Sequence, residues 1–313
     1  MFCHGTVCHI QFPLSVLRHL TTKMLQTVIV VALTILACAS STSNHSYDFI
    51  GKFALVTGGN RGIGLGITSA LLENGVKGVT MVHINPTRSK EAVDSLGAQF
   101  GQGRVIVLIA DVSDEKQLEE AFKKSIAHWG GLDIVINNAG VVNENNPVRL
   151  TNINAIGVMH GTLLGMRHMS VAKGGRGGVV INISSIYGID HLFASPVYSA
   201  TKAYVLGLGR AFGHESYYDQ TKVRVLTLCP GLTDTELLSK VPFKMGISNE
   251  FIPDLIEIAY ALVDSSYLQS PHNLGRAVTV MLQCGASGSV WVAEDEQLPY
   301  EIDIPVRTAM KKQ

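Results

Sequence analysis

The sequence predicts an open α/β fold, in which helices cover both faces of a doubly wound parallel sheet. Short apolar stretches of strand character alternate with amphipathic helical stretches from residue 52 to residue 293. A glycine-rich turn joins the first of these strands to the first helix. The length of 313 residues suits one large domain of this kind. We therefore predict a single domain over residues 47–297, followed by a C-terminal tail over residues 298–313.

Residues 1–46 differ from the rest of the chain and are typical of a signal peptide with a linker. Basic residues precede an apolar run over residues 28–39, which ends in the small residues that signal peptidase reads. A glycosylation sequon begins at Asn44. We predict entry into the secretory pathway, as a secreted protein or in the lumen of the endoplasmic reticulum. An uncleaved membrane anchor that extends from Leu25 is the alternative.

The charge balance gives no sign of a nucleic-acid partner. The 25 basic residues match the 25 acidic residues, so the formal net charge is zero. We expect a small-molecule substrate and no metal ion, and a membrane contact only if the leader stays uncleaved.

The glycine-rich turn is predicted to hold the phosphates of a dinucleotide. It follows the strand predicted over residues 52–57 and precedes the helix predicted over residues 65–74. Glycines let backbone N–H groups approach a pyrophosphate, and the helix N-terminus adds a favourable dipole. The residues expected to bind the cofactor here are Thr57, Gly58, Asn60, Arg61, Gly62, Ile63 and Gly64.

The end of the second predicted strand, residues 79–84, leaves the choice between NAD and NADP open. An acidic residue usually binds the adenosine ribose at this point and selects NAD. This chain has His83 instead. The missing carboxylate removes a repulsion that excludes a 2′-phosphate, and Arg61 or Arg88 could attract one. A solvated charge at a helix start explains Arg88 equally well, and we favour NAD slightly.

The third predicted strand, residues 105–110, leads to the adenine side of the expected site. Asp111 follows it and can accept a hydrogen bond from the adenine amino group, with Val112 beside it. Either Ser113 or Asp114 is expected to cap the next helix.

The fourth predicted strand, residues 132–136, is followed by residues that suit a cofactor ribose. The amide of Asn138 can tie adjacent strand ends together, and the small residues Ala139 and Gly140 leave room. The next helix carries Asn154. A lone buried asparagine usually satisfies backbone groups, although here it could also hold a water in a proton path.

A serine, a tyrosine and a lysine have a spacing that suits proton transfer. The fifth predicted strand, residues 177–184, delivers Ser185, and the helix predicted over residues 196–217 carries Tyr198 and Lys202. Residues four apart on a helix project from one face, so the ammonium can favour the phenolate form of Tyr198. The same spacing also occurs by chance on solvated helices, so its context decides between the two interpretations.

The last part of the chain is predicted to complete the sheet and to cover the site. A sixth strand over residues 222–229, a helix over residues 271–284 and a strand over residues 289–293 are expected. The mostly apolar segment 232–271 is typical of a substrate lid, with ordinary packing over the sheet edge as the alternative. Cofactor contacts beyond the sixth strand are expected from Pro230, Gly231, Thr233 and Thr235.

These motifs together resemble the classical short-chain dehydrogenase/reductase family. They are Thr57-Gly58-x3-Gly62-x-Gly64, Asp111, Asn137-Asn-Ala-Gly140, Asn154, Ser185, Tyr198-x3-Lys202 and Pro230-Gly231. The resemblance covers residues 50 to about 295, and within the family it is greatest to the 15-hydroxyprostaglandin dehydrogenase and insect alcohol dehydrogenase groups. It implies a Rossmann-type domain that binds NAD or NADP, and a homodimer or homotetramer.

The resemblance also implies a role for each of four residues. Tyr198 is expected to be the acid and base, and Ser185 to orient the substrate oxygen. Lys202 is expected to bind the nicotinamide ribose and to lower the tyrosine pKa, while Asn154 supports a proton relay. His83 and the leader depart from the family pattern.

Two classes of function remain open on the sequence. The first is an NAD(P)-dependent oxidoreductase that interconverts a lipophilic secondary alcohol and its ketone, favoured because all four residues are present. The second is a non-catalytic binding or storage protein on the same scaffold, because a fold alone does not fix a function.

Overall fold

The computed structural model describes residues 47–239, 250–252 and 267–311. The leader predicted over residues 1–46 lies outside these residues, as do parts 240–249 and 253–266 of the predicted lid. In the ranges that are described, no helix combines the length and the apolar character that a membrane span needs.

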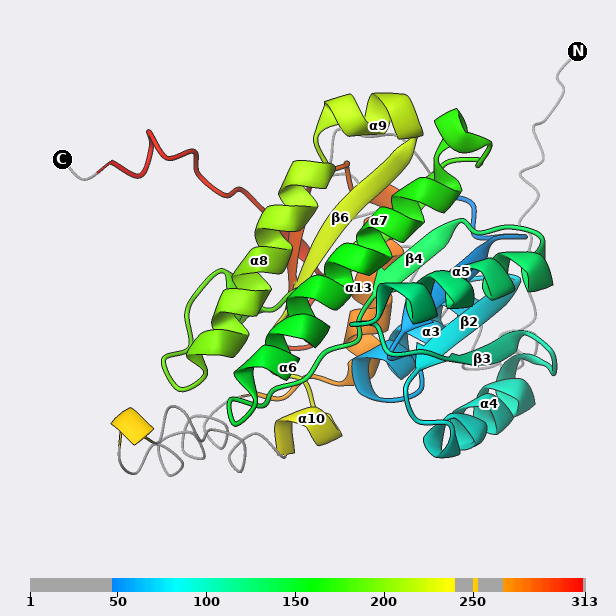
Figure 1. Ribbon diagram of the computed structural model, residues 1–313, viewed down its shortest axis with the longest axis horizontal. Coiled ribbons are helices and arrows are strands. Elements are labelled where there is room, and N and C mark those ends of the chain that lie inside the picture. Colours follow the sequence, from blue (N-terminus) through cyan, green and yellow to red (C-terminus); the bar gives the residue numbers. More distant parts are fainter. Residues whose placement is uncertain (1–46, 240–249, 253–266, 312–313) are drawn as a thin grey trace, which may run out of the picture. The chain divides into compact units, whose positions relative to one another are not determined.

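The described chain forms one sheet with the strand order β3-β2-β1-β4-β5-β6-β7-β8 (Figure 1). All neighbouring strands pair in parallel except β7 and β8, which are antiparallel. The order reverses between β1 and β4, which places a ligand crevice at the carboxyl ends of the strands. The strands are β1 (Phe53–Thr57), β2 (Gly78–His83), β3 (Val105–Ile109), β4 (Ile134–Asn137), β5 (Gly178–Ile183), β6 (Val223–Pro230), β7 (Val290–Ala293) and β8 (Tyr300–Ile302). The prediction of a doubly wound α/β fold is confirmed.

Helices cover both faces of the sheet (Figure 1). On one face lie α5 (Glu115–Trp129), α7 (Gly157–Met169) and α8 (Pro196–Phe212), and on the other lie α3 (Gly62–Glu73), α4 (Thr87–Phe100) and α13 (Pro271–Cys284). Shorter helical segments are α6 (Pro147–Thr151), the π-helical η1 (Asn152–Ile156), η2 (Val171–Lys173), η3 (Ile186–Gly188), α9 (Glu215–Thr221) and α10 (Glu236–Ser239).

Two helices far apart in sequence, α3 and α13, pack at backbone distance. A Cβ on Gly66 of α3 would lie 2.3 Å from the carbonyl oxygen of Pro271, and one on Gly275 would lie 2.5 Å from the carbonyl oxygen of Gly66. Only glycines permit this approach. Pro271, the last residue of the predicted lid, therefore lies directly against α3, the helix that starts at the glycine-rich turn.

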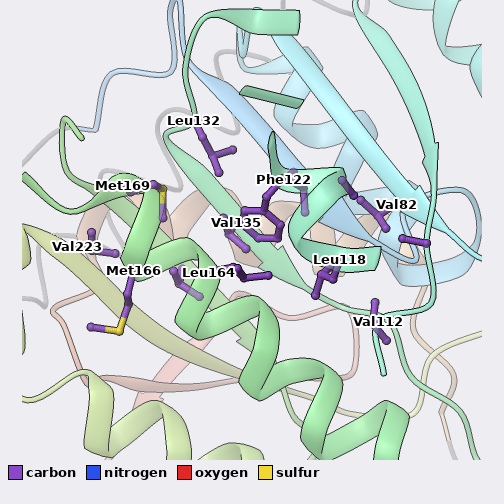
Figure 2. Packing of buried hydrophobic residues seen from close by; sticks show 14 of the residues in the cluster. Val82, Val112, Leu118, Phe122, Leu132, Val135, Leu164, Met166, Met169 and Val223 are labelled. Carbon is purple, nitrogen blue, oxygen red and sulfur yellow. The ribbon is translucent and has the colours of Figure 1, made fainter. Parts of the chain in front are cut away.

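The core between the sheet and helices α5 and α7 is apolar and closely packed. Figure 2 shows Leu118 and Phe122 of α5 beside Val135 of β4 and Leu164 of α7. Each of these four side chains is at most 1% exposed. Burial of side chains this large is the main favourable term for folding, and it fixes the strand ends from which the site is built.

The helix that carries Tyr198 is shorter than predicted. It was expected to run to residue 217, but α8 ends at Phe212. A Cβ on Gly213 would lie 2.3 Å from the Cα of Gly288, so this glycine marks a close contact between two segments of backbone. His214 then caps α9, because its side chain accepts a hydrogen bond from the N–H of Ser216.

The predicted C-terminal tail contains a strand. Tyr300–Ile302 forms β8, which pairs with β7 through Val290, Trp291 and Val292. Three residues are too few to show the alternation of apolar and polar side chains that marks a strand in a sequence. The strand β8 forms because β7 offers an edge with which it can pair.

Candidate active site

A cleft of about 350 Å³ lies at the carboxyl ends of the strands. Of the residues predicted to bind cofactor or to act in catalysis, those that line it are Gly58, Arg61, Gly62, Ile63, Gly64, His83, Asp111, Val112, Asn138, Ala139, Gly140, Ser185, Tyr198, Lys202, Pro230, Gly231, Thr233 and Thr235. Thr57, Asn60 and Asn154 do not line the cleft, although all three lie next to it.

The glycine-rich turn has the shape of a phosphate cradle. A Cβ on Gly64 would lie 2.2 Å from the carbonyl oxygen of Gly58, so the turn closes on itself without room for a side chain. Helix α3 begins after Arg61, which makes no side-chain capping bond to the helix. The first N–H groups of α3 are therefore left for a ligand, and these residues fit the pyrophosphate of a dinucleotide.

Two of the three residues outside the cleft make hydrogen bonds that hold its wall in place. The Thr57 hydroxyl accepts hydrogen bonds from the N–H groups of Asn138 and Ala139, each at 3.0 Å. The Asn60 amide donates to the Ser89 hydroxyl at 3.2 Å and ties the turn to α4. Both side chains are buried and neither lines the cleft.

The adenosine side of the cleft contains a neutral histidine and an aspartate. His83 Nδ1 lies 2.9 Å from the backbone nitrogen of Asn85 and 3.1 Å from the carbonyl oxygen of the same residue. Burial lowers the pKa of His83, so the ring stays neutral at physiological pH. Asp111 accepts both the N–H and the hydroxyl of Ser113 through Oδ1, while Oδ2 lies 3.9 Å from Arg149. A neutral N–H donor and a carboxylate oxygen suit the hydroxyls and amino group of an adenosine.

Lys202 and Tyr198 meet at the other half of the cleft. The Lys202 Nζ donates to the carbonyl oxygen of Ile183 at 3.0 Å and lies 5.6 Å from the centre of the Tyr198 ring. Burial lowers the pKa of Lys202 to about 8. Burial also raises the pKa of Tyr198 to about 12, and a hydrogen bond with Ser185 lowers it only in part. The sequence predicted a lowered tyrosine pKa, whereas burial has the larger effect in this structure.

Asn154 acts on the loop that follows β4. Its Oδ1 accepts the N–H of Val141 and its Nδ2 donates to the carbonyl of the same residue, both at 2.8 Å. Nδ2 also lies 3.3 Å from the Thr201 hydroxyl of α8. The side-chain amide, which was predicted to support a proton relay, is thus used to join the loop beside Gly140 to the helix that carries Tyr198. The π-helical turn η1 brings it to that position.

A buried carboxylate that the sequence did not single out caps helix α8, which carries Tyr198. Glu144 Oε1 accepts the N–H of Tyr198 at 2.8 Å, and Oε2 accepts that of Val197 at 3.3 Å. Its side chain is fully buried. The two partners are more than fifty positions apart in sequence, so no local pattern marks the pair. The buried Ser195 hydroxyl, also missed, lines the cleft and has no partner among the described residues.

The segment after β6 forms the roof of the cleft. The Thr233 hydroxyl donates to the carbonyl oxygen of Gly231 at 2.9 Å. Thr235 lies over the glycine-rich turn, where a Cβ on Gly62 would be 3.1 Å from its methyl carbon. Beyond it, Val142 and Ala194 form a buried apolar cluster, and the residues that pack against this cluster are Leu192, Tyr198, Leu237 and Leu238.

Comparisons with known proteins identify the family of the chain. A family model described as short chain dehydrogenase matches residues 52–245. The chain is 40% identical over 191 residues to 15-hydroxyprostaglandin dehydrogenase (NAD+) of Rattus norvegicus, which is 61% of this chain and 71% of that protein. It is 30% identical over 208 residues to alcohol dehydrogenase 1 of Ceratitis capitata, which is 66% of this chain and 79% of that protein.

A solved structure shares the fold. The dehydrogenase/reductase from Sinorhizobium meliloti 1021 superposes with a TM-score of 0.62 at 23% identity, covering 78% of this chain and 94% of that one. The family model spans most of the Rossmann-type domain, so the chain belongs to the short-chain dehydrogenase family and is an oxidoreductase of its alcohol dehydrogenase and reductase type.

Proposed function

We propose that this enzyme interconverts a lipophilic secondary alcohol and its ketone, with Tyr198 as the general acid and base and NAD favoured over NADP. Ser185 would hold the substrate oxygen, and Lys202 would bind the nicotinamide ribose. NAD(P), when bound, supplies the hydride acceptor or donor. The chain's own residues orient the substrate and move the hydroxyl proton.

The observation that carries this proposal is the meeting of three side chains in one cleft. Ser185, Tyr198 and Lys202 all line it, and the Lys202 ammonium nitrogen lies 5.6 Å from the centre of the Tyr198 ring. A hydroxyl group that enters here meets a hydrogen-bonding partner and a proton acceptor together. A positive charge added to the cleft would favour the phenolate and so counteract the effect of burial on the Tyr198 pKa.

A lipophilic substrate is supported by the surroundings of Tyr198. The cluster of Val142, Leu192, Ala194, Leu237 and Leu238 offers apolar surface beside the ring, and Ile186 and Leu232 extend it. Apolar surface next to a reacting group favours substrates with an apolar body. The relatives named 15-hydroxyprostaglandin dehydrogenase (NAD+) act, by name, on a hydroxylated lipid with NAD, which agrees with both parts of the proposal.

The test compares turnover with cofactor binding in two matched variants. Tyr198→Phe removes only the phenolic oxygen and is expected to reduce the oxidation of long-chain secondary alcohols by about 10²–10⁴-fold. NADH binding, followed by nicotinamide fluorescence, should persist. Tyr204→Phe makes the same change on a partly exposed face of α8 and should leave turnover unaltered.

Full turnover by Tyr198→Phe would contradict the proposed mechanism. Tight binding of lipophilic alcohols by the unmodified protein without any turnover would instead support the binding or storage function. The homodimer or homotetramer and the secretory location remain predictions, which sedimentation and detection of a cleaved leader in secreted material would test.

A further inference from the structure

Two arginines bind one carboxylate at the adenosine end of the cleft. Arg61 lies in the glycine-rich turn, and Arg88 lies in the first turn of α4, which follows β2. Arg61 Nη1 is 2.9 Å from Glu236 Oε2, and Arg88 Nη1 hydrogen-bonds to the same oxygen. Glu236 is the first residue of α10, in the roof segment. This contact joins the turn, the end of β2 and the roof.

The electrostatics of this group depend on Glu236. The carboxylate raises the pKa of Arg88, while burial and the two arginines hold the nearby His83 neutral. These three side chains carry a net charge of +1, and the Glu91 carboxylate also raises the pKa of Arg88. Without Glu236 the charge would be +2 beside the position where the adenosine ribose is expected.

We propose that Glu236 selects NAD over NADP by binding the two arginines that would otherwise bind a 2′-phosphate. This inference rests on the proposed function. In the usual arrangement an acidic residue at the end of β2 repels the phosphate. Here His83 occupies that place, and the carboxylate reaches the same corner from the roof segment, more than 150 residues later in the chain.

The physical reason is competition for the same donors. A phosphate monoester carries a charge of about −2 at neutral pH and binds best to arginines in a bidentate manner. To reach Arg61 and Arg88 it would have to displace Glu236 and then lie beside that carboxylate. The neutral hydroxyls of NAD make no such demand, so the ion pairs stay intact.

Partial exposure sets the size of the effect. The side chains of Arg61, Arg88 and Glu236 are 46%, 50% and 34% exposed, so water and salt screen the contact. We therefore expect a preference of about tenfold for NADH over NADPH at low ionic strength, and a smaller one in high salt.

The experiment is a binding titration of the full-length protein with NADH and NADPH, followed by nicotinamide fluorescence. In Glu236→Gln the affinity for NADPH should rise about tenfold, while that for NADH should change by less than about threefold. Asp234→Asn is the matched control, because it removes one exposed carboxylate from the same segment outside the cleft. It should alter neither affinity.

A second substitution shows whether the arginines carry the gain. Arg88→Gln alone should change the affinity for NADPH little, whereas Arg88→Gln combined with Glu236→Gln should cancel most of the gain. Equal changes of both affinities in Glu236→Gln, or a preference of the unmodified protein for NADPH, would overturn the inference alone. Failure of the unmodified protein to bind either dinucleotide would overturn the proposed function, and the inference with it.

Discussion

The Lys202 ammonium nitrogen lies 5.6 Å from the centre of the Tyr198 ring, and burial moves the pKa values of the two groups apart. The pKa of Lys202 falls to about 8, and that of Tyr198 rises to about 12. Burial therefore disfavours the charged form of both side chains relative to water. A charged ligand changes that balance, so the protonation of this pair should depend on what the cleft holds.

Cofactor affinity should depend on pH through Lys202. The ammonium form is present below a pKa of about 8 and is lost above it, so binding of NADH should weaken as the pH rises from 7 to 9.5. His83 titrates below this window, and Tyr198 and the buried Cys229 titrate above it. Fluorescence titrations across this range would measure the effect. Lys202→Met should bind NADH more weakly, and its affinity should not depend on pH between 7 and 9.5. If the affinity of this variant still fell with rising pH as in the unmodified protein, the titration would belong to another group.

Glu144 should position Tyr198 without touching the substrate. In Glu144→Gln one carboxylate oxygen becomes an amide donor that faces a backbone N–H of α8, which should cost about 1–3 kcal/mol of unfolding free energy. A shifted helix start should also lower kcat several-fold and move its pH profile, with NADH affinity kept. Asp114→Ala, which weakens the N-cap of α5 at a residue that does not line the cleft, is the control and should lower stability by about 1 kcal/mol with kcat unchanged. A Glu144 variant with reduced stability but a normal pH profile would show that the residue has a structural role only.

The glycine-rich turn should not tolerate a side chain at Gly64, where it enters helix α3. A Cβ at Gly64 would lie 2.2 Å from the carbonyl oxygen of Gly58. Gly64→Ala must therefore widen the glycine-rich turn, which points its backbone N–H groups away from a phosphate. NADH affinity should fall at least about tenfold. The control is Gly207→Ala in α8, where nothing lies within 4 Å of an added Cβ and helix propensity predicts a neutral or slightly stabilising change. Similar NADH affinities for the two variants would contradict the cradle.

The C-terminal strand should contribute to stability. Ile302 of β8 packs against a buried cluster that includes Cys229, Val290 and Val292. Ile302→Ala should therefore lower the unfolding free energy by about 1–3 kcal/mol in urea titrations, less than a fully buried isoleucine would. Val306→Ala, at a side chain that is 67% exposed, should change it by less than about 0.5 kcal/mol. Equal effects would mean that β8 is only loosely attached.

The sequence predicted the parts of the fold that depend on local pattern. Each parallel strand has an apolar run, and Asp114, one of the two expected caps, does accept the N–H of Gln117 at 3.1 Å. The glycine-rich turn was also visible, because its function requires several glycines in a fixed place. The end of α8 was missed because Gly213 meets Gly288, a contact between segments that are distant in sequence.

The same distinction holds in the cleft. Ser185, Tyr198 and Lys202 could be found because two neighbouring elements deliver them at a known spacing. The sequence did not reveal Glu144, Arg149 or Glu236, because each of them acts through a contact with a residue on another element. The sequence also suggested that Lys202 would lower the pKa of Tyr198, but the extent of burial, which decides the sign, depends on the whole packed cleft.

Helix α10 lies against both halves of the cleft. Just before it, Thr235 covers Gly62, and within it Leu237 and Leu238 pack against the same apolar cluster as Tyr198. A ligand that shifts this helix at one half alters the surroundings of the other, so the two binding free energies are coupled. Such coupling is reciprocal: the factor by which one ligand tightens the second equals the factor by which the second tightens the first. The protein can be free, bound to the cofactor, bound to the substrate or bound to both. An affinity measured with one ligand alone therefore describes only one of the four binding steps that connect these states.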